Sequence, residues 1–437
     1  MSDCPRRCIR GGVLWLLTSL LMTGTGWTEG KDYFREVAGR TLAVNPKVVA
    51  SQARLDVAMK RQDQAEAALR PNMTFQGQAN QLRTEWDGGV QKTHPDSVEV
   101  ALTQVLFNRK ALVGLEQIAP VIDAARQEYE GACQSVLYEL GEAAIGLLEA
   151  VEVAALARSN QEVTGKHLEA TKARFEVGEL PRTDVSRAEA RLASARADRL
   201  KAENEQAIRR AKFREVAGEE AALPFRLPPW KHAVLEQSLE ALSAAVESRP
   251  DVKAAVAQLD VARLEVELSR SDHYPVLTLN GSRSRTWNLG SQSTPGTLDK
   301  TSLGLGVSVP LYSGGLTMAQ VDQEQARFRA AQADLDRVRQ QALREIEQAF
   351  HQYRNAMVVV DSLVAGERAA RDAADGVAQE FKVGTRTSLD VLDAQHELFT
   401  AATDLTRGRY NVLVSSLQLL RASGVLTPGI LTVDENQ

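Results

Sequence analysis

Cysteine, aromatic residues and long apolar runs are all scarce in this sequence. The 437 residues include 3 cysteines and are 5% aromatic, whereas 43% are hydrophobic and 25% are charged. These fractions exclude a disordered, collagen-like or disulfide-scaffold chain. The body of the chain has no run of about 20 apolar residues, which excludes a polytopic helical membrane protein. With a mean hydropathy of -0.26, the composition by itself is typical of a soluble protein.

Motifs of nucleic-acid binding and catalysis are also missing. The chain has 52 basic and 57 acidic residues, so its net charge of -5 lacks the basic excess of a nucleic-acid-binding protein. It has no phosphate-binding loop and no nucleophile elbow. Its 6 histidines show no pair at metal-ligand spacing, and His396, three residues after Asp393, offers only a chance cation site. We expect no catalytic residue, no cofactor and no metal site.

Residues 1–26 have the pattern of a secretory signal peptide. Arginines precede the apolar segment 13–22, and small residues follow it. About 10 apolar residues are too short to cross a bilayer, so we expect cleavage and export. A retained membrane anchor is the alternative. After cleavage Cys133 is the one remaining cysteine, so the fold is held by packing rather than by an internal disulfide.

The chain is a tandem duplication with a period of about 205 residues. The segment 48–58 (VVASQARLDVA) aligns with 252–262 (VKAAVAQLDVA), and Gly178 aligns with Gly384. Solenoid repeats have periods of about 20 to 50 residues, so each copy here is a whole structural half. The expected segments are a first repeat at 31–223, a proline-rich linker and short helix at 224–249, a second repeat at 250–426 and a C-terminal tail at 427–437.

Each half contains two segments in which apolar and polar residues alternate, such as 302–309 (SLGLGVSV). This alternation predicts strands with one apolar and one polar face. The predicted strands are 72–86 and 96–107 in the first half, and 276–288 and 300–311 in the second. A half-buried soluble sheet is one interpretation, and tilted membrane-spanning strands are the other. Because a barrel in lipid needs at least eight strands and no open edge, four strands can span a membrane only in an oligomer.

Two long helices follow the strands in each half. They are predicted at 110–177, 182–217, 315–382 and 387–423. Apolar residues recur at every seventh position from Leu335 to Val377, and several of them are alanine, which predicts closely packed helical neighbours. A helix of about 65 residues is roughly 100 Å long, more than a compact domain needs. Taken without the strands, these helices also suit an elongated coiled-coil spacer.

The turns between the long helices carry the most specific motif. Residues 174–185 (RFEVGELPRTDV) and 380–391 (EFKVGTRTSLDV) both place a glycine where a helix ends in left-handed geometry. Together with PLYSGG at 310–315, this repeated arrangement resembles the TolC family of outer-membrane channels, the outer membrane efflux proteins of tripartite efflux and type I secretion systems. The resemblance covers nearly all of the chain after the signal peptide.

The resemblance implies an α+β membrane protein that assembles as a homotrimer. Three copies would close one twelve-stranded β-barrel in outer-membrane lipid, and their helices would form a coiled-coil-like barrel through the periplasm. The implied function is an exit duct for drugs, other small molecules or secreted protein, rather than an enzyme. Its implied partners are a periplasmic adaptor and an inner-membrane pump of the RND, MFS or ABC type. A periplasmic coiled-coil adaptor or spacer without a membrane barrel is the alternative.

The resemblance also assigns roles at the two turns. Asp390 and Asp393 match two acidic rings at the family's periplasmic aperture, and a spacing of three places them on one helix face. The alternative for Asp390 is a role in capping the helix with Thr387. The implied lock of the closed state comprises Arg386, Thr183, Asp184 and Phe381, and the implied tips for adaptor docking are Val177, Gly178, Val383 and Gly384. The best-known member has tyrosine in place of Phe381. Phenylalanine has no hydroxyl to bond Asp184, so we expect a weaker lock that rests on Arg386.

Overall fold

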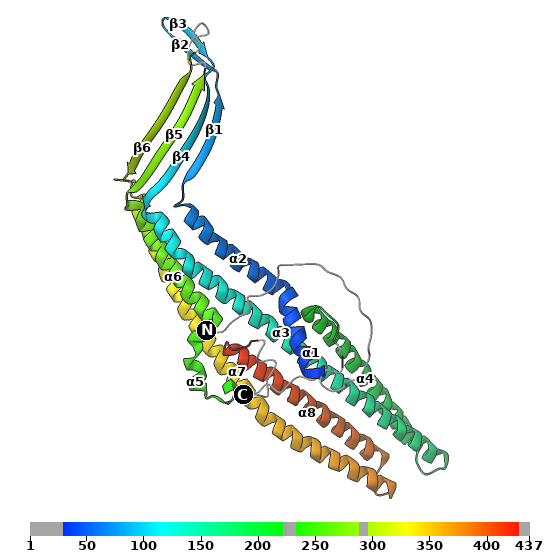
Figure 1. Cartoon of the computed structure of the whole chain (residues 1–437). Helices are drawn as coiled ribbons and strands as arrows, with labels where there is room; N and C mark the ends of the chain where they lie inside the picture. Colours follow the sequence, from blue (N-terminus) through cyan, green and yellow to red (C-terminus); the bar gives the residue numbers. More distant parts are fainter. Residues whose placement is uncertain (1–28, 222, 224–232, 288–295, 428–437) are drawn as a thin grey trace, which may run out of the picture.

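The structure is a computed structural model that describes residues 29–221, 223, 233–287 and 296–427. The predicted signal peptide lies outside the described residues, as do the first part of the predicted linker and all but one residue of the predicted tail. The molecule is elongated, with a β-sheet at one end and helices that run from it to two helical turns at the other (Figure 1).

The main sheet combines strands from both halves of the chain. Its antiparallel order is β1 (Asn72–Ala79), β4 (Asp96–Asn108), β5 (Val276–Trp287) and β6 (Leu298–Ser308). The central pair, β4 and β5, joins the two halves, and the register shifts at a bulge between Val105 and Phe107. Strands β1 and β6 are the edges, so each has one row of backbone groups that no described strand pairs.

The segment 72–86, predicted as one strand, is two strands in the structure. β1 ends at Ala79, and β2 (Leu82–Trp86) pairs with β3 (Gly89–Thr93) in a separate hairpin. β1 ends where its partner strand begins, because Ala79 pairs with Asp96, the first residue of β4. Beyond that point β2 pairs with β3 instead, across a turn at Asp87 and Gly88, and Asp-Gly is a preferred sequence for such hairpin turns. The predicted strand 300–311 begins at Leu298 and ends before Pro310, which lacks the amide hydrogen that a ladder requires.

The two faces of the main sheet differ in polarity. Pairing places Phe75 opposite Val100, and it aligns Leu102, Gly281 and Leu303 across neighbouring strands. Residues of this face are mostly apolar and exposed: Met73, Phe75, Leu303, Leu305 and Val307 are 67% to 79% exposed. The opposite face is polar, with Thr74, Gln76, Glu99, Ser282, Ser284, Ser302 and Lys300. The apolar face of the sheet is therefore exposed in the single chain, and no other described element packs on it.

Two long helical hairpins make up most of the molecule (Figure 1). The first-half hairpin is α3 (Arg109–Glu176) with α4 (Arg182–Ala217), and the second-half hairpin is α7 (Leu316–Lys382) with α8 (Ser388–Ala422). In each hairpin the second helix is about half as long as the first. A separate shorter helix, α2 (Pro46–Ala67) in the first half and α6 (Pro250–Arg270) in the second, lies beside the rest of the longer helix toward the sheet (Figure 1). The remaining helices are α1 (Glu29–Val44), α5 (Leu239–Ala244) and the 3₁₀ segments Ala233–Glu236, Val246–Ser248 and Ser271–His273.

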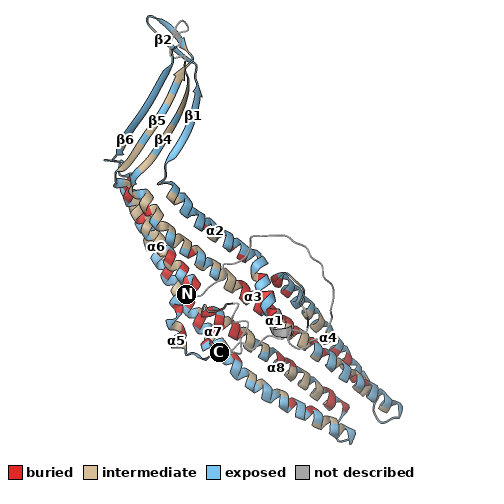
Figure 2. Ribbon diagram, viewed as in Figure 1, coloured by how far each residue is buried: buried red, intermediate tan, exposed pale blue. Residues whose placement is uncertain are grey.

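Small residues allow the helices to pack closely. The heptad alanines Ala342, Ala349 and Ala356 are 0% to 3% exposed. A Cβ at Gly141 would lie 2.6 Å from Leu417 Cδ2, so a larger residue there would force the Leu417 side chain between α3 and α8 to move. The largest buried cluster lies midway along the molecule, where all of the long helices meet (Figure 2). Among the described residues, no helix combines the length and the apolar character needed to cross a bilayer.

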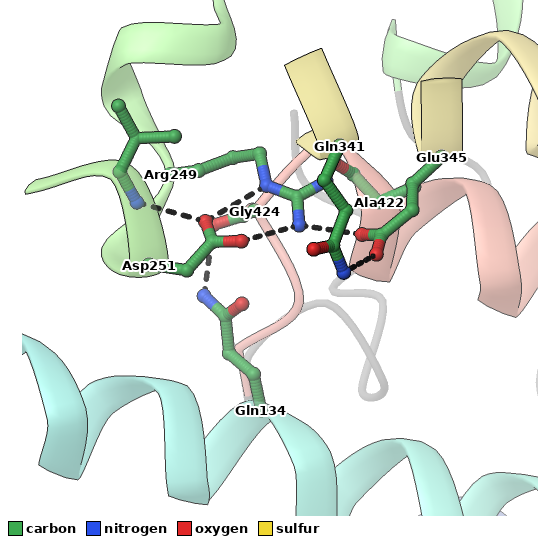
Figure 3. Close-up of polar contacts among 8 residues, drawn as sticks. Gln134, Arg249, Asp251, Gln341, Glu345, Ala422 and Gly424 are labelled. Atoms are coloured by element: carbon green, nitrogen blue, oxygen red, sulfur yellow. Dashed lines mark hydrogen bonds and ion pairs between the residues drawn. The ribbon is translucent and has the colours of Figure 1, made fainter. Parts of the chain in front are cut away.

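A buried arginine fixes the start of the second half against the long helices (Figure 3). Arg249 is 9% exposed in its side chain and donates to both carboxylate oxygens of Asp251, at 2.9 and 2.7 Å. It also donates to Glu345 Oε2 on α7 at 2.7 Å and to the Ala422 carbonyl at the end of α8 at 2.8 Å. A buried cation is tolerated only when it is paired, so this cluster sets where α6 begins.

Candidate functional site

The candidate site is the end of the molecule where the two hairpins turn. We call residues 177–181 the first tip and residues 383–387 the second tip. Both tips have the same backbone: Gly178 has φ +82° and Gly384 has φ +81°, a region that side chains rarely allow. The amide of Gly178 donates to Phe175 at 2.9 Å, and that of Gly384 donates to Phe381 at 3.2 Å. The duplication has therefore kept the turn itself.

The second tip caps its own helix. The Thr387 hydroxyl accepts from the Asp390 amide at 3.3 Å, and Asp390 Oδ2 accepts from the Thr387 amide at 2.9 Å. This is a reciprocal capping box at the start of α8. Hydrogen bonds from the backbone and hydroxyl of Thr387 hold the pKa of Asp390 below its usual value. The structure thus contains the capping contact that was the alternative role for Asp390.

Arg386, the predicted lock arginine, lies against its own tip. Its Nε donates to Glu380 Oε2 at 2.7 Å, and both side chains are about half exposed. Among the described residues of this one chain, no hydrogen bond joins Arg386 to Thr183 or Asp184. A lock through those partners would therefore require another arrangement of the two hairpins, or a neighbouring copy, to bring Thr183 or Asp184 to the guanidinium.

Phe381 contacts the first-half hairpin through its ring. The Arg174 guanidinium lies over this ring, with Cζ 4.5 Å from the centroid, and the His167 ring centroid is 5.7 Å away. Both partners are on α3. A cation over an aromatic face is attracted by the ring quadrupole. Phe381 has no hydroxyl that could donate a hydrogen bond, so it contacts the first-half hairpin through its ring, against Arg174 and His167.

His167 also binds the first turn of α8. Its Nε2 lies 2.9 Å from the Ser388 hydroxyl, and Ser388 is 1% exposed. Burial lowers the pKa of His167, and the nearby Arg174 charge lowers it further, against the opposing effect of the Ser388 hydrogen bond. The neutral imidazole is therefore the form that fits between the two hairpins.

Asp393 has a partner that the sequence did not reveal. Arg191 on α4 donates to Asp393 Oδ1 across the two hairpins, and the arginine side chain is 31% exposed. A small apolar cluster lies beside the pair: Leu168, Ala188, Leu192 and Leu392 are all 9% exposed or less. One available signal was the duplication, since Arg187 and Arg191 of the first half align with Asp393 and Glu397 of the second. Because aligned positions of the two halves carry opposite charges, ion pairs between the first-half and second-half hairpins are favoured.

The outermost residues of the tips are apolar and exposed. Val177 is 72% exposed and Val383 is 76% exposed, and each directly precedes the left-handed glycine of its tip. Both valines are therefore accessible from outside the chain, as the docking role implied by the resemblance requires.

A groove opens on the side of the hairpins, between α3, α4 and α8. Its volume is about 630 Å³, and charged residues such as Lys201, Arg209 and Arg407 line it with alanines between them. Burial raises the pKa of Glu149 in this groove, with the charges of Arg407 and Arg209 opposing the shift. Among the described residues, no group of His, Cys, Asp and Glu is arranged to hold a metal ion.

Comparison with known proteins agrees with this architecture. The family model described as outer membrane efflux protein matches residues 37–219 and 241–425, that is, both halves. The outer membrane protein TolC of Vibrio cholerae is 28% identical over 414 residues, which cover 92% of each chain. The outer membrane efflux protein BepC of Brucella suis is 30% identical over 369 residues, which cover 83% of this chain and 79% of BepC.

Solved structures share the fold. The outer-membrane channel OprN superposes with a TM-score of 0.79 at 23% identity, covering 92% of this chain and 91% of OprN. The outer membrane protein VceC of Vibrio cholerae has a TM-score of 0.78 at 19% identity, covering 90% of this chain and 96% of VceC. The long hairpins and the four-stranded sheet are therefore the fold of known outer-membrane channels.

Proposed function

The chain belongs to the outer membrane efflux protein family, and we propose that three copies of it form one continuous duct through the outer membrane and the periplasm. As a member of this family it is an outer-membrane protein that passes substrates outward. The observation that carries the proposed assembly is the sheet, which has an exposed apolar face and two unpaired edges.

The edges determine that the barrel needs other copies. In lipid, an open strand edge leaves backbone groups without hydrogen-bond partners at a cost of several kcal/mol each. In an assembly of identical copies, β6 of one copy is free to pair with β1 of the next. Three copies of the four-stranded sheet close twelve strands, which is within the range of bacterial outer-membrane barrels.

The two faces of the sheet suit the two sides of a barrel wall. The apolar face, with Phe75 and Leu303, would contact lipid. The polar face, with Gln76 and Ser282, would line water. The hairpins would then continue the duct through the periplasm to an aperture at the tips.

The tips would form the gate of this duct. Three-fold symmetry would place Asp390 and Asp393 of each copy around the axis, where rings of like charge attract cations. Replacing both with alanine is then expected to abolish block by multivalent cations. Arg386 would lock the closed state by donating to Thr183 or Asp184 of a neighbouring hairpin.

The partners follow from the same arrangement. A passive duct needs an energised pump and a protein that connects the two. We propose that a periplasmic adaptor docks at the exposed tips, where Val177 and Val383 precede Gly178 and Gly384. An inner-membrane pump would then deliver the substrate to the aperture.

Membrane fractionation of two matched variants tests the duct. Phe75→Lys puts a charge on the apolar face and should cost about 2–4 kcal/mol near the bilayer midplane, so we expect little protein in the outer membrane. Gln76→Lys makes the same change on the polar face and should be tolerated. The parent, extracted in detergent, should have the mass of three copies. Equal insertion of the two variants, or a parent protein that washes off the membrane as an adaptor or spacer would, contradicts the proposal.

A further inference from the structure

The first turns of α8 are held to the first-half hairpin by three different contacts. Ser388 binds His167, Leu392 packs with Leu192, and Asp393 pairs with Arg191. In the first two contacts the residue of α8 is buried, since Ser388 is 1% exposed and Leu392 is 3% exposed. The third lies at the surface of the gate, and it involves one of the two acids that the aperture presents.

The two acids of the aperture differ in where their partners lie. The partner of Asp390 is Thr387, three residues away at the start of the same helix, so this bond moves with the second-half hairpin. The partner of Asp393 is on the other hairpin, so the bond breaks when the hairpins separate. Separation therefore frees a carboxylate at Asp393 and leaves Asp390 unchanged.

We propose that Arg191 is a tethered counter-ion, which neutralises Asp393 while the hairpins are together and releases it when they part. This inference rests on the proposed function, because it requires the tips to gate the duct. Arg191 is well placed for such a role, because its neighbour Leu192 is 9% exposed and Leu392, next to Asp393, is 3% exposed in the same cluster. The apolar cluster fixes the two backbones, and the ion pair lies beside it.

A consequence is that cation binding and opening are coupled. A multivalent cation that binds Asp393 competes with the Arg191 guanidinium for the same carboxylate. It therefore binds more tightly to separated hairpins than to joined ones. By linkage, the cation must favour separation by the same factor. The closed aperture then has one carboxylate per copy that no arginine of the other hairpin neutralises, and the open aperture has two.

Conductance of single channels in a planar bilayer, titrated with hexaamminecobalt(III), tests this inference. Arg191→Gln should raise the open probability by about two- to fivefold for each pair lost, the range of an exposed ion pair. It should also tighten cation block by a similar factor. Arg187→Gln is the matched control, since it removes the same charge one turn away on the same helix. Its effect on block should be smaller, because a more distant charge is screened by salt.

A second pair of variants separates the ion pair from a general loosening of the tip. Asp393→Asn should also raise the open probability but should weaken the block, and adding Arg191→Gln to it should change neither quantity further. The exchange Arg191→Asp with Asp393→Arg should restore the low open probability. The inference is overturned if Arg191→Gln and Arg187→Gln change open probability and cation block equally, or if block is weaker in Arg191→Gln. Either result leaves the proposed duct function intact. A parent protein that never conducts overturns the proposed function, and the inference with it.

Discussion

The two tips have the same backbone but different side-chain bonds. Gly178 and Gly384 have φ angles within one degree of each other. In the second tip Thr387 caps α8 and exchanges hydrogen bonds with Asp390. In the first tip Pro181 occupies the corresponding position, and its side chain makes no capping bond to α4. The two halves therefore share the backbone of the turn, but only the second half has a side-chain cap at the start of the following helix.

This difference matters for the proposed gate, in which the second-half hairpin moves as a unit. Within the second-half hairpin Thr387 bonds to Asp390, and Arg386 pairs with Glu380 at the end of α7. This end of the hairpin contacts the first-half hairpin through the side chains of Phe381, Ser388 and Asp393. The gating that we propose would break these side-chain contacts and leave the backbone of the turn intact.

Valine substitutions at the two glycines test whether the turns are alike. Gly178→Val and Gly384→Val each place a side chain in left-handed geometry, which costs about 1–2 kcal/mol. We expect equal increases in the rate of amide hydrogen exchange at the two tips, measured by mass spectrometry. A much larger effect at one tip would show that the shared backbone is not equally stable.

Alanine substitutions at two threonines test the difference between the tips. Thr387→Ala removes the cap of α8 and should destabilise the start of this helix by about 1 kcal/mol. Thr183→Ala is the matched control in the first turn of α4, where threonine caps nothing. Hydrogen exchange should rise at the second tip only. The same increase in both variants would show that the capping box contributes nothing.

Lowering the pH should weaken the link between the hairpins. The pKa of His167 is lowered from its ordinary 6.5, mainly by burial, so the joined state favours the neutral ring. This stabilisation is complete above pH 6.5 and is lost as the pH falls below it. Open probability should rise between pH 7.5 and pH 5.5. His167→Gln, which keeps a polar group near Ser388 but does not titrate, should remove that rise, and a rise that persists in this variant would assign it to another group.

The smallest effect on the tip itself is expected at Arg386. Its ion pair with Glu380 is exposed, and such pairs contribute little to stability. Arg386→Ser should therefore leave hydrogen exchange at the second tip unchanged. If Arg386 locks neighbouring hairpins, the single-channel conductance of this variant should exceed that of the parent. No increase would count against the lock.

Local patterns predicted the elements well. The structure has helices at Arg109–Glu176 and Leu316–Lys382, close to the predicted 110–177 and 315–382, because heptad spacing and the glycine turns are signals within the segment. The break of 72–86 at residues 80–81 was missed, because it depends on where the partner strand β4 begins, which lies in another segment.

Contacts between the halves could not be predicted in the same way. Arg191 and Asp393 are 202 positions apart, and the sequence around each residue does not indicate that the other is its partner. The position of Phe381 beneath Arg174 depends likewise on how two hairpins pack. The resemblance predicted which residues form the tips and the acidic rings, whereas the bonds between the two hairpins became visible only in the structure.

The central claim is that the second-half hairpin gates the duct by moving against the first. Cross-linking tests it directly. With Cys133→Ala as background, Arg191→Cys and Asp393→Cys would be joined by a short bismaleimide, and Lys172→Cys with Glu189→Cys would join the two helices of the first-half hairpin as a control, since those residues already pair. In planar bilayers, the link between hairpins should abolish openings and the control link should leave them unchanged. Openings of unchanged size and frequency after linking Arg191→Cys to Asp393→Cys would contradict the account.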